Sequence, residues 1–231
     1  MIIELRDNNY MKFFDKDIKL VIFDLDGTLI HSTNLWADID RRFFAKRGMM
    51  IPPTYNQEIA HVGLRKAGEI TKDKYLPNEN VDDIISEWME MSYEAYRDYI
   101  PLKDRAQELL EFIYKQNIPM ALATANSKEI YDVCLTRLGI RQYFGLVLDV
   151  NSCKNGKNSP EIYDRAISHF NVKREETLIL EDMIVPIITA HNAGYNVIAV
   201  YDEESTKDEK ACIDNSDLFI KNFGEVLDCL K

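Results

Sequence analysis

The stretch KLVIFDLDGTLI, residues 19–30, carries the strongest structural signal in the chain. It begins with a short, continuous apolar run that ends in an acid, Asp24. A strand covered by helices on both faces has a continuous apolar sequence of this kind, because neither face meets water. Similar short apolar runs recur further along the chain, at 118–124, 146–149, 177–181, 196–201 and 218–220. These segments predict the strands of a parallel sheet.

Helical patterns fill the intervals between these runs. Apolar residues recur at helical spacing near 102–116 and in 127–138, where Ser127 is placed to cap the helix. Segments 160–170 and 186–193 also fit helices, and Pro186 suits a first helical turn. Regular alternation of strand and helix predicts an α/β fold with a doubly wound parallel sheet.

One region breaks this alternation. From about residue 32 to residue 99 the sequence shows no convincing strand, only helical patterns at 34–47, 64–75 and 81–99. We therefore expect an α/β core domain formed by 1–31 and 100–231, with a small all-helical cap domain, 32–99, inserted after the first strand. A few extra helices packed on the sheet are the open alternative.

Composition limits the classes of function. The formal net charge is −11, with 46% hydrophobic and 29% charged residues, which is ordinary for a soluble globular protein. This charge argues against a nucleic-acid partner. The four scattered cysteines do not form a disulfide or metal-binding pattern. The first 19 residues lack the apolar core of a secretory signal, and no run approaches a membrane span. A cytoplasmic monomer with no membrane partner is expected.

Polar residues stand where the predicted strands end. Asp24 and Asp26 follow the first strand, Thr124 ends the second, and the pair 181–182 (Glu-Asp) ends a later one. Lys157 lies in a loop between the last two, just before a helix. Because ligands of open parallel sheets bind at the carboxyl ends of the strands, these groups are expected to converge.

This set of residue types suits phosphoryl transfer. A carboxylate nucleophile divides the slow hydrolysis of a phosphate monoester into two easier steps. A cation and a lysine reduce the repulsion between carboxylate and phosphate, and a second carboxyl moves the proton. Carboxylates suit Mg²⁺ as ligands.

The motifs resemble those of the haloacid dehalogenase-like superfamily, in particular its subfamily with a helical cap. FDLDGTLI (23–30) is similar to the first motif of that family, and LATAN (122–126) to the second. GKNSPEIY (156–163) resembles the third, and LILEDM (178–183) followed by AHNAGY (190–195) resembles the fourth. The resemblance covers about residues 19–220.

The resemblance implies a role for each matching residue. It implies Asp24 as nucleophile and magnesium ligand, and Asp26 as general acid/base whose backbone carbonyl also binds the metal. Thr124 and Lys157 would contact the transferring phosphoryl group. Asp182 would bind Mg²⁺, with Glu181 beside it in the metal site. Asp26 also argues against a dehalogenase, because the dehalogenases lack this second aspartate.

The remaining candidates concern the substrate. Ala125 and Asn126 follow Thr124 in the second motif. Segment 60–69 resembles the specificity loop of the cap, with Gly63, Arg65 and Lys66 available to a distal anionic group. Solvated cations at a helix start are the favoured interpretation of Arg65 and Lys66. His31 either contacts substrate or simply begins the linker. Trp36 belongs either to the cap core or to the face that meets the substrate.

These features predict a Mg-dependent phosphatase, a phosphoric monoester hydrolase, that acts on a small phosphorylated metabolite through an aspartyl-phosphate. A phosphomutase of the β-phosphoglucomutase type is the alternative enzyme. Its branch carries a histidine in the first cap helix, near the place of Trp36 here, which favours hydrolysis. A non-catalytic binding protein would be expected to have lost Asp24 or Asp26, and this chain keeps both.

Overall fold

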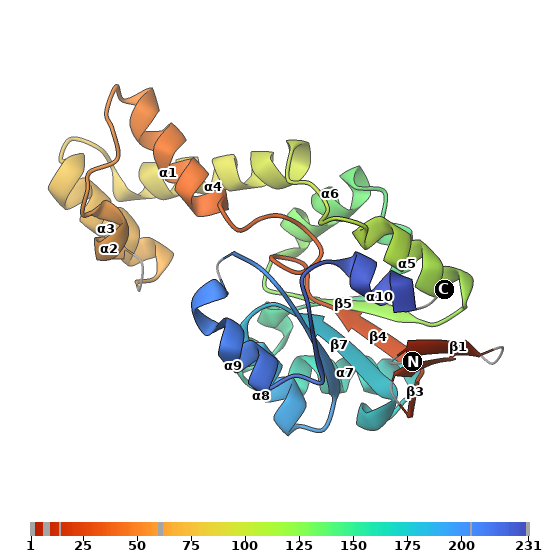
Figure 1. The fold of residues 1–231 in the computed structure, drawn as a ribbon. Helices are drawn as coiled ribbons and strands as arrows, with labels where there is room; N and C mark the ends of the chain where they lie inside the picture. The colour runs from red at the N-terminus through yellow and green to blue at the C-terminus, as the bar shows by residue number, and fades with distance from the viewer. Residues whose placement is uncertain (1–2, 7–9, 14, 60–61, 204, 230–231) are drawn as a thin grey trace. The chain divides into compact units, whose positions relative to one another are not determined.

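The computed structural model describes residues 3–6, 10–13, 15–59, 62–203 and 205–229 (Figure 1). The chain divides into two compact units: a core unit, Met1–Thr33 with Ile100–Lys231, and a helical unit, Asn34–Tyr99. The use of the helical unit as a cap stays a prediction. None of the described helices is both long enough and apolar enough to cross a bilayer.

The core unit is built on a six-stranded sheet in the order β6-β5-β4-β7-β8-β9, with every neighbouring pair parallel. Its strands are β4 (Leu20–Phe23), β5 (Met120–Thr124), β6 (Leu146–Asp149), β7 (Thr177–Glu181), β8 (Asn196–Val200) and β9 (Leu218–Ile220). β4 comes first in this sheet along the chain yet lies inside it, because β5 pairs with one edge of β4 and β7 with the other. The predicted doubly wound α/β fold is confirmed.

Helices cover both faces of this sheet. They are α5 (Ala106–Lys115), α6 (Lys128–Arg137), α7 (Glu161–Phe170), α8 (Ile184–Asn192), α9 (Glu209–Asp214) and α10 (Phe223–Cys229). In Figure 1, α5 and α10 lie on one side of the sheet, and α7, α8 and α9 on the other. Leu20 and Ile22 belong to the buried cluster with α7 and α8. The alternation of side chains along a strand turns Val21 and Phe23, also fully buried, to the opposite face.

Two details of the helix starts differ from the sequence expectation. α8 begins at Ile184, so Pro186 lies inside the first turn instead of opening it. Ser127 occupies the N-cap position of α6, but its side chain makes no capping hydrogen bond.

A three-stranded antiparallel sheet precedes β4, and the sequence did not predict it. Its strands are β1 (Ile3–Arg6), β2 (Tyr10–Phe13) and β3 (Lys16–Ile18), in that order. Met11, Phe13 and Ile18 are buried, and Lys16 Nζ donates to Asn196 Oδ1 over 2.7 Å at the start of β8. This small sheet therefore packs at the end of the parallel strands opposite to their carboxyl edge.

The helical unit contains α1 (Leu35–Lys46), α2 (Tyr55–Ile59), α3 (Leu64–Tyr75) and α4 (Val81–Asp98). The sequence predicted all of them except the short α2. Aromatic rings form its interior: Phe43 lies 5.4 Å from Trp88 and Phe44 lies 4.8 Å from Tyr55, measured between ring centroids. These pairs join α1 to α4 and to α2.

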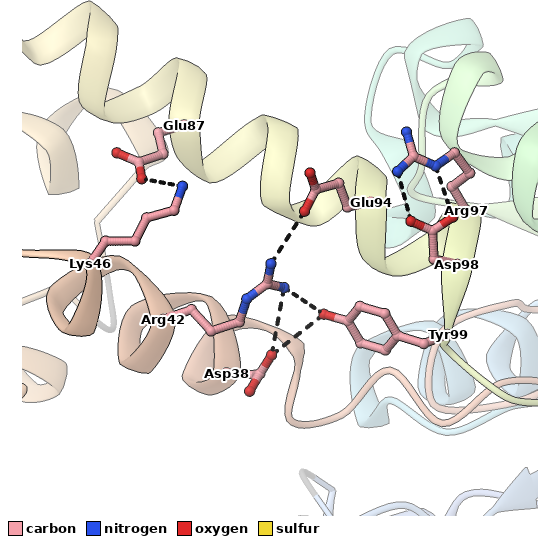
Figure 2. A network of polar contacts seen from close by, with 8 residues as sticks. All are labelled: Asp38, Arg42, Lys46, Glu87, Glu94, Arg97, Asp98 and Tyr99. Atoms are coloured by element: carbon pink, nitrogen blue, oxygen red, sulfur yellow. Dashed lines mark hydrogen bonds and ion pairs between the residues drawn. The ribbon is translucent and has the colours of Figure 1, made fainter.

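A network of polar contacts joins the outer surfaces of α1 and α4 (Figure 2). Arg42 donates to Glu94 over 3.2 Å and to the Tyr99 hydroxyl over 3.0 Å, and Lys46 pairs with Glu87 over 2.9 Å. Surface pairs of this kind contribute little individually, so the aromatic interior holds the unit together and the network fixes the pairing of the two helices.

Candidate active site

The carboxyl ends of β4, β5 and β7 lie side by side because these strands are neighbours in the sheet. Asp24 directly follows β4, and its N–H donates to the Leu180 carbonyl over 3.0 Å, which continues the pairing with β7. Thr124 ends β5 and Glu181 ends β7. The sheet order therefore brings together residues that lie up to 157 positions apart, as the separation of Asp24 from Glu181 shows.

Three carboxylates form a buried cluster at this edge. Asp24, Glu181 and Asp182 each offer an oxygen, and these oxygens all lie within 4.8 Å of one another. The three residues are only 6%, 2% and 3% exposed, respectively. Among the described residues, no other group of three or more acidic, histidine or cysteine side chains has this geometry.

Lys157 supplies positive charge to the cluster. It lies in a short 3-10 turn, Gly156–Asn158, and its ammonium pairs with Asp24 Oδ1 and, over 2.7 Å, with Glu181 Oε2. Burial alone would lower the pKa of the Lys157 ammonium, but the carboxylates of Asp24 and Glu181 outweigh it and hold that pKa well above its usual range. Lys157 is therefore a fixed cation near neutral pH.

One lysine does not balance three carboxylates. Burial, and then the neighbouring charge of Asp24, raise the pKa of Glu181 to about 7 despite the contact with Lys157. Burial and the charges of Glu181 and Asp24 likewise raise the pKa of Asp182 well above its usual range. Fully ionised, the cluster would carry excess negative charge, which a divalent cation would offset. Its carboxylate oxygens are donors that suit Mg²⁺, so the residues present fit the metal that the family resemblance implies.

Two residues that the sequence analysis did not single out shape the position of Asp182. Thr28 is fully buried and donates its hydroxyl to Asp182 Oδ1 over 3.0 Å. Gly27 has a φ of +75°, and a Cβ placed on it would lie 2.3 Å from Asp182 Oδ2. Only glycine combines this backbone with room for the carboxylate. Both residues lie inside FDLDGTLI, directly after Asp26, and this position in the motif could have marked them as residues of the site.

Asp26 lies at the same edge, held from the β5 side. Asn126 Nδ2 donates to Asp26 Oδ2 over 2.5 Å, and the Asn126 N–H donates to the Thr124 hydroxyl over 3.1 Å. Thr124 is fully buried, whereas Ala125 next to it is exposed. The loop after β5 therefore connects Thr124 with Asp26 through one asparagine.

Tyr163 adds a buried hydroxyl to this region. It lies on α7 and is 1% exposed, and its Oη has no hydrogen-bond partner among the described residues. Burial, and then the charge of Glu181, raise the pKa of Tyr163 well above its usual range, so the group stays neutral. The uncharged hydroxyl therefore adds a polar group to the surroundings of Lys157 and Glu181.

The other predicted substrate residues are His31 in the core unit and four residues of the helical unit. The side chain of His31 is exposed, and its backbone N–H donates to the Pro101 carbonyl over 2.9 Å. Gly63, Arg65, Lys66 and Trp36 belong to the helical unit. Arg65 pairs with Asp82, Lys66 pairs with Glu69 over 3.1 Å, and Trp36 is 48% exposed on α1. Ala60 and His61, which begin the predicted specificity loop, lie outside the described residues.

Comparisons with known proteins agree with this arrangement. Residues 21–200 match the family model described as haloacid dehalogenase-like hydrolase. A validoxylamine A 7'-phosphate phosphatase of Streptomyces hygroscopicus subsp. limoneus is 27% identical over 213 residues, which cover 90% of this chain and 95% of the relative. A phosphorylated carbohydrates phosphatase of Thermotoga maritima is 26% identical over 218 residues, covering 93% and 99%.

Solved structures give the same result. A Thermotoga maritima protein described provisionally as a β-phosphoglucomutase matches with a TM-score of 0.82 and 25% identity, over 93% of this chain and 100% of its own. Because the family match runs through the strands that carry Asp24, Thr124 and Glu181, the motif resemblance is confirmed and this chain belongs to the haloacid dehalogenase-like hydrolase family.

Proposed function

We propose that this hydrolase is a Mg²⁺-dependent phosphatase in which Asp24 attacks the phosphorus of a small phosphorylated metabolite. The observation that carries the proposal is the pairing of Asp24 with Lys157 inside the buried carboxylate cluster. A carboxylate that only supported the fold would not need two further carboxylates within 4.8 Å, since burying like charges together is costly.

In the first step, a carboxylate oxygen of Asp24 forms a bond to phosphorus while the ester P–O bond breaks. The departing oxygen takes a proton from the Asp26 carboxyl, so that the alcohol leaves neutral. The products are the alcohol, an aspartyl-phosphate on Asp24 and an ionised Asp26. Lys157, already bound to the Asp24 carboxylate, lowers the repulsion that the incoming phosphate meets.

In the second step, Asp26 takes a proton from water as that water bonds to phosphorus, and the bond from phosphorus to Asp24 breaks. Inorganic phosphate leaves, and both aspartates return to their starting state. Asn126 holds Asp26 through its amide, on the side of the loop that follows β5. The Thr124 hydroxyl accepts a bond from Asn126 N–H, so its own hydrogen is available for a phosphoryl oxygen.

Asp24, Asp182 and Glu181, with the backbone carbonyl of Asp26, are the groups that would hold Mg²⁺. When bound, the ion would supply charge stabilisation to the phosphoryl oxygens and offset the excess negative charge of the cluster. The net charge of −11 makes this local positive charge necessary for an anionic substrate.

The names of the relatives support a phosphorylated carbohydrate or a similar small metabolite as substrate. Two of them are a phosphatase of phosphorylated carbohydrates and a phosphatase of validoxylamine A 7'-phosphate. A monomer that acts on a free metabolite in the cytoplasm is part of the same proposal.

An aryl phosphate assay tests the chemistry. Purified protein should hydrolyse the ester with Mg²⁺ and stop after EDTA is added. Asp24→Asn should abolish turnover and also the mass increase of one phosphoryl group seen in the acid-quenched wild-type protein. Asp149→Asn is the matched control, because Asp149 ends the neighbouring strand β6 outside the cluster. Turnover by folded Asp24→Asn would refute the nucleophile.

A phosphomutase remains the second candidate, because the Thermotoga maritima structure with a TM-score of 0.82 is described provisionally as a β-phosphoglucomutase. The protein would be given a sugar 1-phosphate together with a sugar bisphosphate as primer. Release of inorganic phosphate supports the phosphatase, whereas accumulation of the isomeric sugar 6-phosphate supports the mutase.

A further inference from the structure

The two chain segments that connect the core unit to the helical unit run side by side where they leave the core. The His31 N–H donates to the Pro101 carbonyl over 2.9 Å, and the Lys103 N–H donates to the Leu29 carbonyl over 2.8 Å. Ile30 and Leu102 form an antiparallel bridge between these two contacts. The segments therefore form a short two-stranded ribbon that belongs to the core unit.

A buried ion pair fastens this ribbon to the sheet. Asp202 follows β8 and is 3% exposed, and its carboxylate pairs with Lys103 Nζ over 2.8 Å. The Thr33 hydroxyl lies 2.6 and 2.7 Å from the two oxygens of the same carboxylate. Lys103 Nζ also donates to the Tyr201 carbonyl over 2.7 Å. One carboxylate thus holds the outgoing segment through Thr33 and the returning segment through Lys103.

The returning segment has an additional anchor. Arg137, in the last turn of α6, donates to the carbonyl of Ile100, which is the first residue of the returning segment in the core unit. Core contacts therefore reach the last core residue before the helical unit, Thr33, and the first one after it, Ile100.

The pair of Lys103 and Asp202 is buried, unlike an ordinary surface ion pair. Lys103 is 9% exposed, and burying a lysine and an aspartate costs free energy that is repaid only when hydrogen bonds surround both charges. The ion pairs on the surface of the helical unit are different: Lys46 and Arg65 keep more than half of their side chains exposed.

We propose that Thr33, Lys103 and Asp202 form a linker clamp, which confines any rotation of the helical unit to the backbone between Thr33 and Asn34 and between Tyr99 and Ile100. The clamp also separates the loop from Asp24 to Ile30 from such a rotation. Ile30 bridges to Asp26 as well as to Leu102, so a ribbon that moved would move Asp26 with it. With the ribbon fixed to β8, the helical unit can turn while the loop from Asp24 to Ile30 keeps its geometry.

Hydrogen–deuterium exchange of the full-length protein tests the clamp directly and does not depend on phosphatase activity. Asp202→Asn weakens both contacts of the carboxylate, and Thr33→Val removes only the hydroxyl. In both variants the amides of His31 and Lys103, which bond across the ribbon, should exchange faster, on the order of tenfold for loss of one hydrogen bond to a charged group. The amide of Asp24, bonded to Leu180, should keep its wild-type rate.

Arg174→Gln is the matched control. It breaks an Arg–Asp pair of the core unit, with Asp164 at 2.7 Å, that does not touch the ribbon. Exchange at His31 and Lys103 should stay unchanged in this variant. The clamp is refuted if both amides keep their wild-type rates in folded Thr33→Val and Asp202→Asn. It is equally refuted if exchange rises throughout the parallel sheet, because the pair would then be a general stabiliser. Failure of the phosphatase assay would leave either result unaffected.

Discussion

Thr28 orients the carboxylate of Asp182 without belonging to the acidic cluster itself. Its hydroxyl donates to Asp182 Oδ1 over 3.0 Å, and the residue is completely buried. A donor at this place selects one rotamer of the aspartate and leaves the second oxygen, Oδ2, beside Gly27. Partners of this kind set the geometry of a metal ligand while making no contact with the metal.

Thr28→Val keeps the shape of the side chain and removes the donor. We expect the Mg²⁺ concentration for half-maximal activity to rise by about 10–100-fold, with little change in the rate at saturating metal. Calorimetric titration with Mg²⁺ should show the same weakening without any substrate. Thr136→Val, on the exposed face of α6, is the control. Unchanged Mg²⁺ affinity in Thr28→Val would refute this role.

At the scale of single residues, the sequence predicted which residues lie close together but not the hydrogen bonds between them. Asp24, Thr124, Lys157 and the pair at 181–182 could be placed together because parallel strands align their carboxyl ends. The bond from Asn126 to Asp26 could not be predicted, since it depends on the path of the loop after β5. The role of Thr28 likewise depends on a backbone turn that only Gly27, with φ +75°, permits.

At the scale of elements, α1 carries a buried acid on its apolar face. Asp40 lies among Ile39, Phe43 and Phe44 on the buried side of the helix. Burial raises the pKa of Asp40 from 3.8 to about 6, and a hydrogen bond with Tyr55 offsets only part of this rise. Near neutral pH the ionised carboxylate therefore destabilises the helical unit.

The pH dependence of stability follows from this pKa. Between pH 3.8 and about 6 the folded protein holds the Asp40 proton and the unfolded chain does not, so stability falls as pH rises through this window. Asp40→Asn should remove this fall and raise stability at pH 7 by roughly 1–2 kcal/mol, allowing for partial solvation. The free energy of unfolding at each pH is measured by urea unfolding followed through tryptophan fluorescence. This signal reports on the helical unit, because Trp36 and Trp88, the only two tryptophans, both lie there.

The control for Asp40 is an exposed acid of the same unit. Asp83→Asn on α4 changes the charge by the same amount and should leave the slope between pH 4 and 6 as in the wild type. If the stability of Asp40→Asn fell between pH 4 and 6 as steeply as that of the wild type, the pH dependence could not come from Asp40.

The sequence predicted the strands of the parallel sheet and missed those of the small antiparallel sheet for a physical reason. β4 and β7 are buried along their whole length and mainly apolar, because helices cover both of their faces. The strands β1 to β3 span only three or four residues each, too few for a period of two to stand out. Arg105 takes a left-handed conformation, φ +58°, at the start of α5, a position that residue preferences assign to glycine or asparagine.

At the scale of the whole molecule, the proposed metal site would couple metal binding to stability. The raised pKa values of Glu181 and Asp182 show that the ionised cluster opposes folding near neutral pH when no cation is bound. In the proposed function Mg²⁺ binds the folded state, so it should stabilise that state by about 2.7 kcal/mol at one hundred times its dissociation constant.

Asp182→Asn separates these two effects. Without metal, and at a pH where the Asp182 carboxyl is ionised, the variant should melt at a higher temperature than the wild type, because one buried charge has been removed. With saturating Mg²⁺, the wild type should gain melting temperature and the variant should gain much less. Differential scanning calorimetry with EDTA and with Mg²⁺ gives both values, and Asp149→Asn should respond to Mg²⁺ as the wild type does. A metal-free Asp182→Asn that melts below the wild type would contradict the electrostatic account.

The place of β4 between β5 and β7 also has a consequence for synthesis on the ribosome. Val21 pairs with Met120 on one side and with Leu178 on the other, so neither partner exists when β4 leaves the exit tunnel. At about 5–20 residues per second, β7 follows β4 after on the order of ten seconds or more. During that interval the apolar segment of β4 has no strand to pair with. The helical unit, whose contacts are local, is free to form first. Asp24, the proposed nucleophile, is thus among the first residues made, and its surroundings are among the last to be completed.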